Sequence, residues 1–346
     1  MLLRRQPGKV GGSLSTIVAP ALLMIAVIAV IALSLTMVTG PGGQAVQGHP
    51  GHPGPVAADY IVIGAAPAPR RAPLPGSAAS TGSFTSHCGR NTNGHRNSDN
   101  FIAFPGVSNG AHHIHDYAGN TSTDRNSTDE SLAAATTTCQ RGDKSVYFWP
   151  VLRDIRRGGE DAGQPGGGRD GNLGRILTPD EVSIDFLGNP QARVQPMPRF
   201  LRIVTGDAKA VTNGPHPPNA RANWTCSGTP GRASSTHYPL CPPGQLVQRT
   251  GEYPSCWNRA DTDSDNHRTH VTFPDPATGA CPAGTGPIPR LRITVGYRVP
   301  PGRSFAIDTF PDQQRKAVTD HFDFENLMPE SLMRLVVECI NTARTC

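Results

Sequence analysis

Residues 290–299 read RLRITVGYRV, a short run of β-branched and aliphatic side chains that stops at a proline. Such a composition, bounded by Gly, Pro or Asn, is typical of a β-strand. Runs of the same kind occur earlier in the chain, at NFIAFP (100–105), SVYFWPVL (145–152), VSIDFL (182–187), RFLRIVTG (199–206) and HVTFP (270–274). Long segments such as the Gly-rich loop 156–172 separate them. We therefore expect a mainly β, sandwich-like fold with long loops.

One soluble helix is predicted, close to the C-terminus, over MPESLMRLVVECINTA (328–343). Pro329 suits the first turn of a helix. Four apolar side chains repeat at helical spacing and share one face, namely Leu332, Leu335, Val336 and Cys339. The fold class is accordingly a single mainly β domain with a C-terminal helix.

The composition favours a loop-rich protein with a modest core. Of 346 residues, 36% are hydrophobic and 6% aromatic, and Gly (38) and Pro (34) are both frequent. The formal net charge is +5. Because no Lys/Arg-rich run with interleaved aromatic residues is found, nucleic acid is not an expected partner.

The eight cysteines predict a disulfide-bonded domain. None of them forms a C-x-x-C pair, which argues against a zinc ribbon or a thioredoxin-like site. An even number of cysteines in an exported chain indicates disulfides. We expect sequential pairing, with free thiols as the alternative, and the pairs are Cys88–Cys139, Cys226–Cys241, Cys256–Cys281 and Cys339–Cys346.

The N-terminus carries a membrane-targeting pattern. Arg4, Arg5 and Lys9 precede 22 uncharged residues (17–38), which suffice to cross about 30 Å of hydrocarbon as a helix with the N-terminus inside the cell. The run exceeds the usual apolar region of a secretory signal and lacks an A-x-A-like site after it. We expect an uncleaved signal-anchor at the cell membrane, with secretion after cleavage as the alternative.

This pattern divides the chain into four parts. Residues 1–16 form a cytoplasmic basic segment and residues 17–38 the transmembrane signal-anchor. A linker rich in Pro, Gly and Ala follows over 39–86, and its composition is typical of a flexible stalk. A single extracellular domain occupies 87–346.

Three groups of His and Asp residues are the candidates for chemistry. They are His113, His115 and Asp116 in GAHHIHDYAGN (110–120), His267 and His270 in DTDSDNHRTHVTFP (261–274), and His321 and Asp323 in DHFDFEN (320–326). Residues two apart on a strand share one face, and neutral imidazole is the commonest ligand of first-row metals. The sequence contains no G-x-S-x-G motif, which would have indicated a serine hydrolase.

These groups predict one polar pocket with a divalent metal ion as the candidate cofactor. The metal ligands would be His113, His115, His267, His270 and His321. Asp116 and Asp323 would act as catalytic bases or orient the ligands. For each histidine, an ordinary hydrogen-bonded structural role remains the alternative.

At these same groups the chain resembles the DUF1996 domain, an uncharacterised domain of secreted fungal and actinobacterial proteins. The stretches that carry the resemblance are AHHIHDYAGN (111–120), DKSVYFWPVL (143–152), MPRFLRIVTGD (197–207), SCWNRADTDSDNHRTHVTFP (255–274), ACPAGTGPIPRLRITVGYRV (280–299) and DHFDFENLMPESLMRLVVEC (320–339). Two positions depart from the family pattern, because Asn266 replaces an acid and Gly286-Pro287 replaces His-Pro. The resemblance implies one domain and these candidate positions, and no reaction.

Two function hypotheses follow, and whether the protein is an enzyme stays open between them. The first is a metal- or carboxylate-assisted hydrolase acting on cell-wall or environmental polysaccharide. The second is a non-catalytic surface module that binds glycan or wall polymer. Its stacking faces would come from Tyr117, Trp149, Trp224, Tyr253 and Trp257.

Overall fold

The structure is a computed structural model that describes residues 54–214 and 217–346. The segments predicted to be cytoplasmic (1–16) and membrane-spanning (17–38) lie outside the described residues. Within them, no helix is both long enough and apolar enough to cross a membrane.

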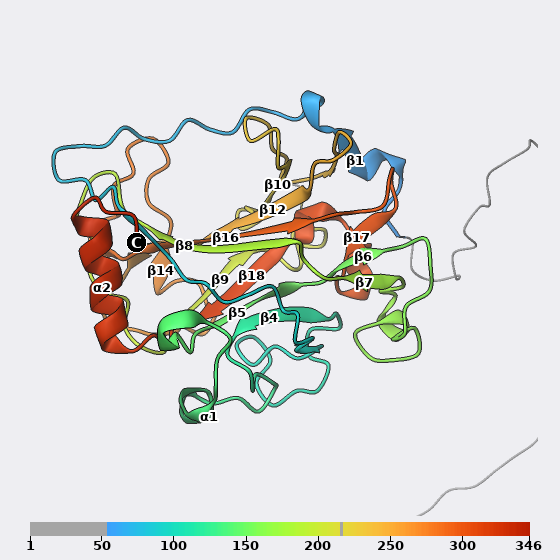
Figure 1. The fold of residues 1–346 in the computed structure, drawn as a ribbon, viewed down its shortest axis with the longest axis horizontal. Helices are drawn as coiled ribbons and strands as arrows, with labels where there is room; N and C mark the ends of the chain where they lie inside the picture. The colour runs from blue at the N-terminus through green and yellow to red at the C-terminus, as the bar shows by residue number, and fades with distance from the viewer. Residues whose placement is uncertain (1–53, 215–216) are drawn as a thin grey trace, which may run out of the picture. The chain divides into compact units, whose positions relative to one another are not determined.

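Two five-stranded antiparallel sheets form most of the domain (Figure 1). The β16 sheet contains, in spatial order, β10 (Asn223–Cys226), β12 (Val247–Glu252), β16 (Arg290–Tyr297), β8 (Glu181–Leu187) and β2 (Ser83–Thr85). The β18 sheet contains β3 (Arg96–Asn97), β4 (His115–Gly119), β5 (Val146–Pro150), β18 (His321–Glu325) and β9 (Arg202–Gly206).

Three small sheets and two α-helices accompany them, together with six short 3-10 helices in the connecting segments of the described part. The small sheets pair β1 (Tyr60–Val62) with β11 (Tyr238–Leu240), β13 (Cys256–Trp257) with β14 (Val271–Thr272) and β15 (Gly286–Pro287), and β6 (Leu152–Asp154) with β7 (Arg175–Leu177) and β17 (Phe305–Ile307). The α-helices are α1 (Asp129–Ala134) and α2 (Glu330–Asn341). The prediction of a mainly β domain with a C-terminal helix is confirmed.

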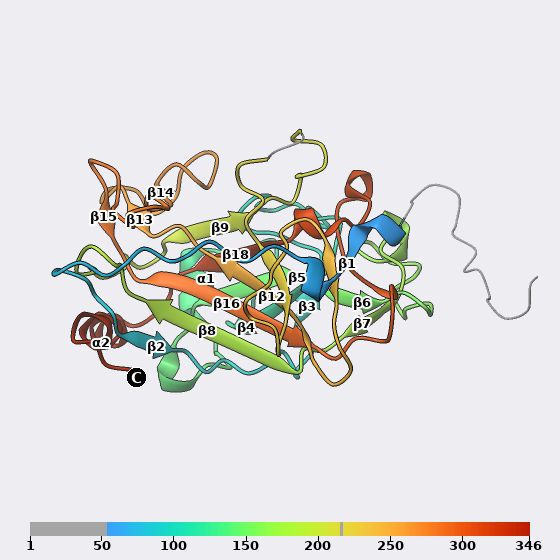
Figure 2. The same cartoon turned by 90° about the horizontal axis from the view of Figure 1, so that it is seen from above.

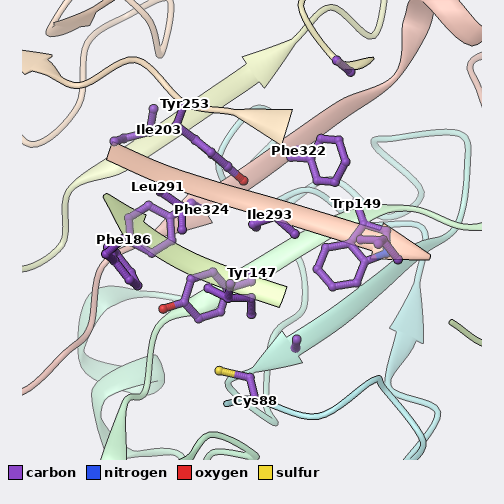
Figure 3. Packing of buried hydrophobic residues seen from close by; sticks show 14 of the residues in the cluster. Cys88, Tyr147, Trp149, Phe186, Ile203, Tyr253, Leu291, Ile293, Phe322 and Phe324 are labelled. Carbon is purple, nitrogen blue, oxygen red and sulfur yellow. The ribbon is translucent and has the colours of Figure 1, made fainter. Parts of the chain in front are cut away.

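The main core lies between the β16 and β18 sheets, as Figure 3 shows. Phe322 and Phe324 point into it from β18, because alternate residues of a strand face opposite sides of the sheet. The ring of Phe324 lies 5.2 Å from that of Tyr147 on β5 and 6.4 Å from that of Phe186 on β8. The same alternation sends His321, the first residue of β18, to the other face.

That other face of the β18 sheet is also covered. A second apolar cluster lies on it, made of Phe101, Ile102, Tyr117, Leu132, Val146, Phe148 and Leu327. Its members come from β4, β5, α1, the loop between β3 and β4, and the segment between β18 and α2. Polar residues on this face are therefore shielded from water, which decides the properties of the site described below.

Most of the predicted strands are confirmed, and one is wrong. The run NFIAFP (100–105) forms a turn and not a strand. The side-chain oxygen of Asn100 accepts hydrogen bonds from the backbone N–H groups of Ile102 (3.1 Å) and Ala103 (2.9 Å). Such local bonding competes with a strand ladder. The apolar residues of the run are buried nonetheless, as part of the second cluster.

All four predicted disulfides are confirmed. Cys88 pairs with Cys139, Cys226 with Cys241, Cys256 with Cys281, and Cys339 with Cys346, so that no cysteine is free. Four disulfides indicate a domain that folds in an oxidising, extracellular-type compartment.

Part of the predicted linker is ordered. Residues 54–86 run along the domain, and β1 and β2 lie within them (Figure 2). Tyr60 belongs to a short apolar stretch of this segment, ADYIVIG (58–64). It is buried, and its hydroxyl donates a hydrogen bond to the carbonyl of Phe305. Lys316 forms an ion pair with Asp59 at 2.8 Å. A few apolar side chains thus suffice to hold a segment whose overall composition is typical of a stalk.

Candidate metal site

Three of the predicted ligands meet on the covered face of the β18 sheet. The Nε2 atom of His113 lies 3.1 Å from Nε2 of His115 and 3.2 Å from Nε2 of His321. All three side chains are buried, with residue exposures of 1%, 0% and 4%. We call this cluster the histidine trio, and its ligand atoms are mutually close enough to hold a metal ion.

The strand topology explains why residues two hundred positions apart in sequence come together. His115 is the first residue of β4 and His321 the first of β18, and β5 runs between these two strands. The two rings reach toward each other across β5, where the ring of Phe148 lies 5.1 Å from that of His115. His113 approaches from the segment that leads into β4.

Backbone carbonyl groups orient two of the three rings. Nδ1 of His115 lies 3.1 Å from the carbonyl oxygen of Asp99, and Nδ1 of His321 lies 3.0 Å from that of Thr319. A carbonyl can only accept, so both Nδ1 atoms carry the proton. Each Nε2 therefore presents a lone pair to the centre of the trio, which is the arrangement usual for histidines that bind metals.

Burial keeps the trio neutral. Desolvation lowers the pKa of His113, and the neighbouring rings of His115 and His321 lower it further. Burial lowers the pKa of His115 in the same way and brings that of His321 down to about 4. Neutral imidazole is the form that binds a metal ion, so at neutral pH the trio carries no imidazolium charge that would oppose binding.

The spacing of the trio fits a tetrahedral metal ion with an open position. Zn–N bonds of about 2.0–2.1 Å at tetrahedral angles place ligand nitrogens about 3.3–3.4 Å apart. The two Nε2 separations from His113 fall slightly below this range. Nδ1 of His113 has no hydrogen-bond partner among the described residues. It is thus the one ring whose orientation is held by packing, against Phe310 at 5.3 Å.

Asp323 shares the covered face with the trio. It stands two residues beyond His321 on β18, and burial raises the pKa of its carboxyl group to about 7. One carboxyl oxygen accepts a hydrogen bond from Asn100 at 3.4 Å, and the other has no partner among the described residues.

Asp116 faces the opposite way. As the residue after His115 it points to the inner face of the β18 sheet, where it is fully buried. Its carboxyl group accepts from Nε of Arg96 at 2.6 Å and from Asn91 at 2.7 Å. The structure therefore does not bring Asp116 together with the trio.

His267 and His270 also lie apart from the trio, in the loop between β13 and β14. His267 contacts Asp263 through Nδ1 at 2.9 Å. His270 uses both ring nitrogens, because Nε2 donates to the carbonyl of Arg202 at 2.6 Å and Nδ1 accepts from Ser264 at 2.9 Å. In this arrangement the pair fastens the loop to the edge strand β9, seen beside β13 and β14 in Figure 2.

Sequence reasoning missed Arg268, which stands between these two histidines. Its guanidinium donates to the carbonyl of Gly206 at 2.9 Å and approaches that of Val204 at 3.5 Å. In the register of β9 and β18, Gly206 lies opposite His321 and Val204 opposite Asp323. The signal that could have found it is its place between His267 and His270, within the same motif.

The residue at position 206 has to be glycine because His321 approaches it closely. An ideal Cβ at Gly206 would lie 2.5 Å from Cα of His321 and closer still to the carbonyl oxygen of Asp320. Its backbone also has a φ of +85°, a conformation that favours glycine. The position of a trio member on its strand thus depends on the absence of a side chain on the neighbouring strand.

We predict that Gly206→Ala lowers the affinity for a metal ion as well as stability, because His321 has to shift. Gly302→Ala is a matched control, since Gly302 has a φ of +77° and open space around it. The control should lose about 1 kcal/mol of unfolding free energy from its backbone conformation alone. Denaturant titration and zinc titration compare the two variants. Equal losses in both would show that the close approach at position 206 is unimportant.

The aromatic residues considered as sugar-stacking faces are mostly buried. Tyr117, Trp149, Trp224 and Tyr253 have exposures of 2% or less. Trp257 alone among the five is partly exposed, and its indole N–H donates to the carbonyl of Asp261 at 2.7 Å. Four of these five rings therefore serve the core.

Together these features define a disulfide-bonded, mainly β domain of the extracellular type, with a buried cluster of three histidines on one sheet. Residues 101–326 match the family described as "Domain of unknown function (DUF1996)", and the chain belongs to this family. No curated protein and no solved structure was found to match the chain.

Proposed function

We propose that the protein is a metal-dependent hydrolase that acts outside the cell on cell-wall or environmental polysaccharide. The observation that carries the proposal is the convergence of three Nε2 atoms, from His113, His115 and His321, which lie close enough together to bind one ion. Zn²⁺ is the proposed ion, because three histidines with an open fourth position are a common zinc arrangement in hydrolytic sites.

The metal would supply the activation of a water molecule near neutral pH. The chain's own residues then have separate roles. The carbonyls of Asp99 and Thr319 hold two of the ligand rings in the binding tautomer. Asp323, on the same face and with a free carboxyl oxygen, is the proposed proton acceptor. Asp116, His267 and His270 lie outside the proposed site.

The cellular setting is part of the proposal. The uncharged run 17–38 would anchor the protein in the cell membrane as a single span, and residues 39–53 would connect it to the domain outside. The four disulfides support an extracellular position for the domain. Cleavage after the apolar run, with release of the domain, is the alternative.

A second candidate function is favoured by the burial of the trio. Side chains with exposures of 4% or less are hard for a polymer to reach. In this alternative the domain is a non-catalytic glycan- or wall-binding module. The trio would then be structural, with or without a metal, and in the metal-free form the Nε2–H of His113 would donate to the other two rings.

Hydrolysis assays on the full chain separate the two. We expect the zinc-loaded protein to release reducing ends from at least one wall or environmental polysaccharide. A chelator should abolish this activity, and zinc should restore it. The variant His321→Ala should be inactive, because it lacks one of the three metal ligands. The variant Trp257→Ala, which keeps all three, should keep its metal. If the zinc-loaded chain binds polysaccharide without cleaving any, the hydrolase proposal fails and the binding module is favoured.

A further inference from the structure

We infer that Arg268 and the metal held by the histidine trio together form a binding site for an oxyanion, so that the glycan recognised is an acidic one. The inference rests on the proposed function, since it takes the metal as one half of the site. It adds the chemical class of the substrate: a polysaccharide that carries carboxylate, sulfate or phosphate groups.

The first observation is that Arg268 has no acidic partner. Among the described residues, no carboxylate oxygen lies within 4.0 Å of its guanidinium nitrogens, whereas Arg153, Arg202 and Arg249 all form such ion pairs. Its guanidinium donates hydrogen bonds to two backbone carbonyls of β9. A guanidinium has five N–H donors, so most of its donor capacity is free for a ligand.

The second observation is its position. Arg268 is bonded to Gly206, which lies opposite His321 on the neighbouring strand. His321 is the most exposed of the trio, at 4% against 1% and 0%. The limited access of solvent to the trio is therefore greatest at His321, the member whose strand neighbour Arg268 contacts. The guanidinium is itself only partly buried, so it can contact a ligand.

The third observation is the charge around this position. Lys209 adds a second cation, with its ammonium 3.8 Å from the centre of the Phe310 ring that packs on His113. Three acids also face the region, and one of them, Asp312, already pairs with Lys209 at 3.8 Å. Asp207 already accepts from the amide of Asn213 at 2.9 and 3.0 Å, and Asp323 is deeply buried. With a divalent ion bound, positive charge exceeds negative charge.

An oxyanion satisfies both halves of such a site. One of its oxygens would bind the metal ion held by the trio as a further ligand beside the activated water, since zinc sites can expand to five ligands, and the others would accept from the planar fork of the arginine. A neutral sugar hydroxyl offers neither the charge nor the paired acceptors. No covalent bond of the substrate is made or broken in this binding step.

Calorimetric titration of the zinc-loaded full chain tests the inference. Trigalacturonate is compared with neutral galactotriose, and inorganic sulfate and phosphate report which oxyanion is preferred. We expect the acidic trisaccharide to bind at least about tenfold tighter than the neutral one. Arg268→Gln should remove this preference while the metal content stays unchanged. Arg268→Lys should keep part of it, because lysine keeps the charge and lacks the fork.

The control is Arg298→Gln, which removes an arginine of 81% side-chain exposure just after β16 and should leave both affinities unchanged. Thermal unfolding of each variant checks that it is folded. Equal affinity for the two trisaccharides, or a preference that persists in Arg268→Gln, overturns the inference. Absence of bound metal in the wild type is a different result, which overturns the proposed function.

Discussion

Replacement of His115 by alanine is expected to abolish metal binding. The variant removes one of three converging ligands, and the remaining two cannot hold an ion against dilution. The wild-type full chain should retain about one zinc ion after gel filtration, and His115→Ala close to none. Metal content is measured by mass spectrometry of the eluted protein, with circular dichroism to confirm that the variant is folded.

His267→Ala is the matched control for this experiment. Its ring lies in the β13–β14 loop and contacts Asp263, away from the trio. We expect it to keep its zinc. If His267→Ala loses as much metal as His115→Ala, the ligand set differs from the trio and includes the loop.

The second large effect is expected from Asp308→Ala, which should cost about 3–5 kcal/mol of unfolding free energy. Asp308 is fully buried and forms a paired contact with Arg153, at 2.6 and 2.8 Å. It also accepts from the backbone N–H of Ile114, the residue between two trio members, at 3.3 Å. Removing the carboxylate leaves the buried Arg153 guanidinium with less negative charge beside it. It also removes the hydrogen bond that holds the backbone at Ile114.

Urea denaturation of the metal-free full chain measures this loss. Asp312→Ala is the control, because that side chain is 51% exposed and its ion pair with Lys209 spans 3.8 Å. Its unfolding free energy should change by no more than about 0.5 kcal/mol. A loss below about 1 kcal/mol in Asp308→Ala would show that the buried network contributes little.

The strands and disulfides could be predicted because their signals are local. A run such as VSIDFL alternates within six residues, and each disulfide joins cysteines that follow one another in sequence. The run NFIAFP could not be classified this way. Its composition is that of a strand, and the bonds from Asn100 that turn it depend on a single side chain.

The site was predictable in part, and for a definite physical reason. His113 and His115 share a face by their spacing, and the same alternation already places Asp116 on the opposite face. The strands β4 and β18 both pair with β5, and this strand order brings His321 to His113 and His115. Such an order is a property of the whole sheet. The pair His267 and His270 resembles a ligand pair in sequence. Whether a ring nitrogen is already hydrogen-bonded, as both are in His270, depends on a carbonyl sixty-eight residues away.

The most direct measurement is anomalous X-ray diffraction at the zinc edge from crystals of the zinc-loaded protein. We expect one strong peak, about 2.0–2.1 Å from Nε2 of His113, His115 and His321. A peak at another place, or zinc-soaked crystals with no density between the three rings, would contradict it.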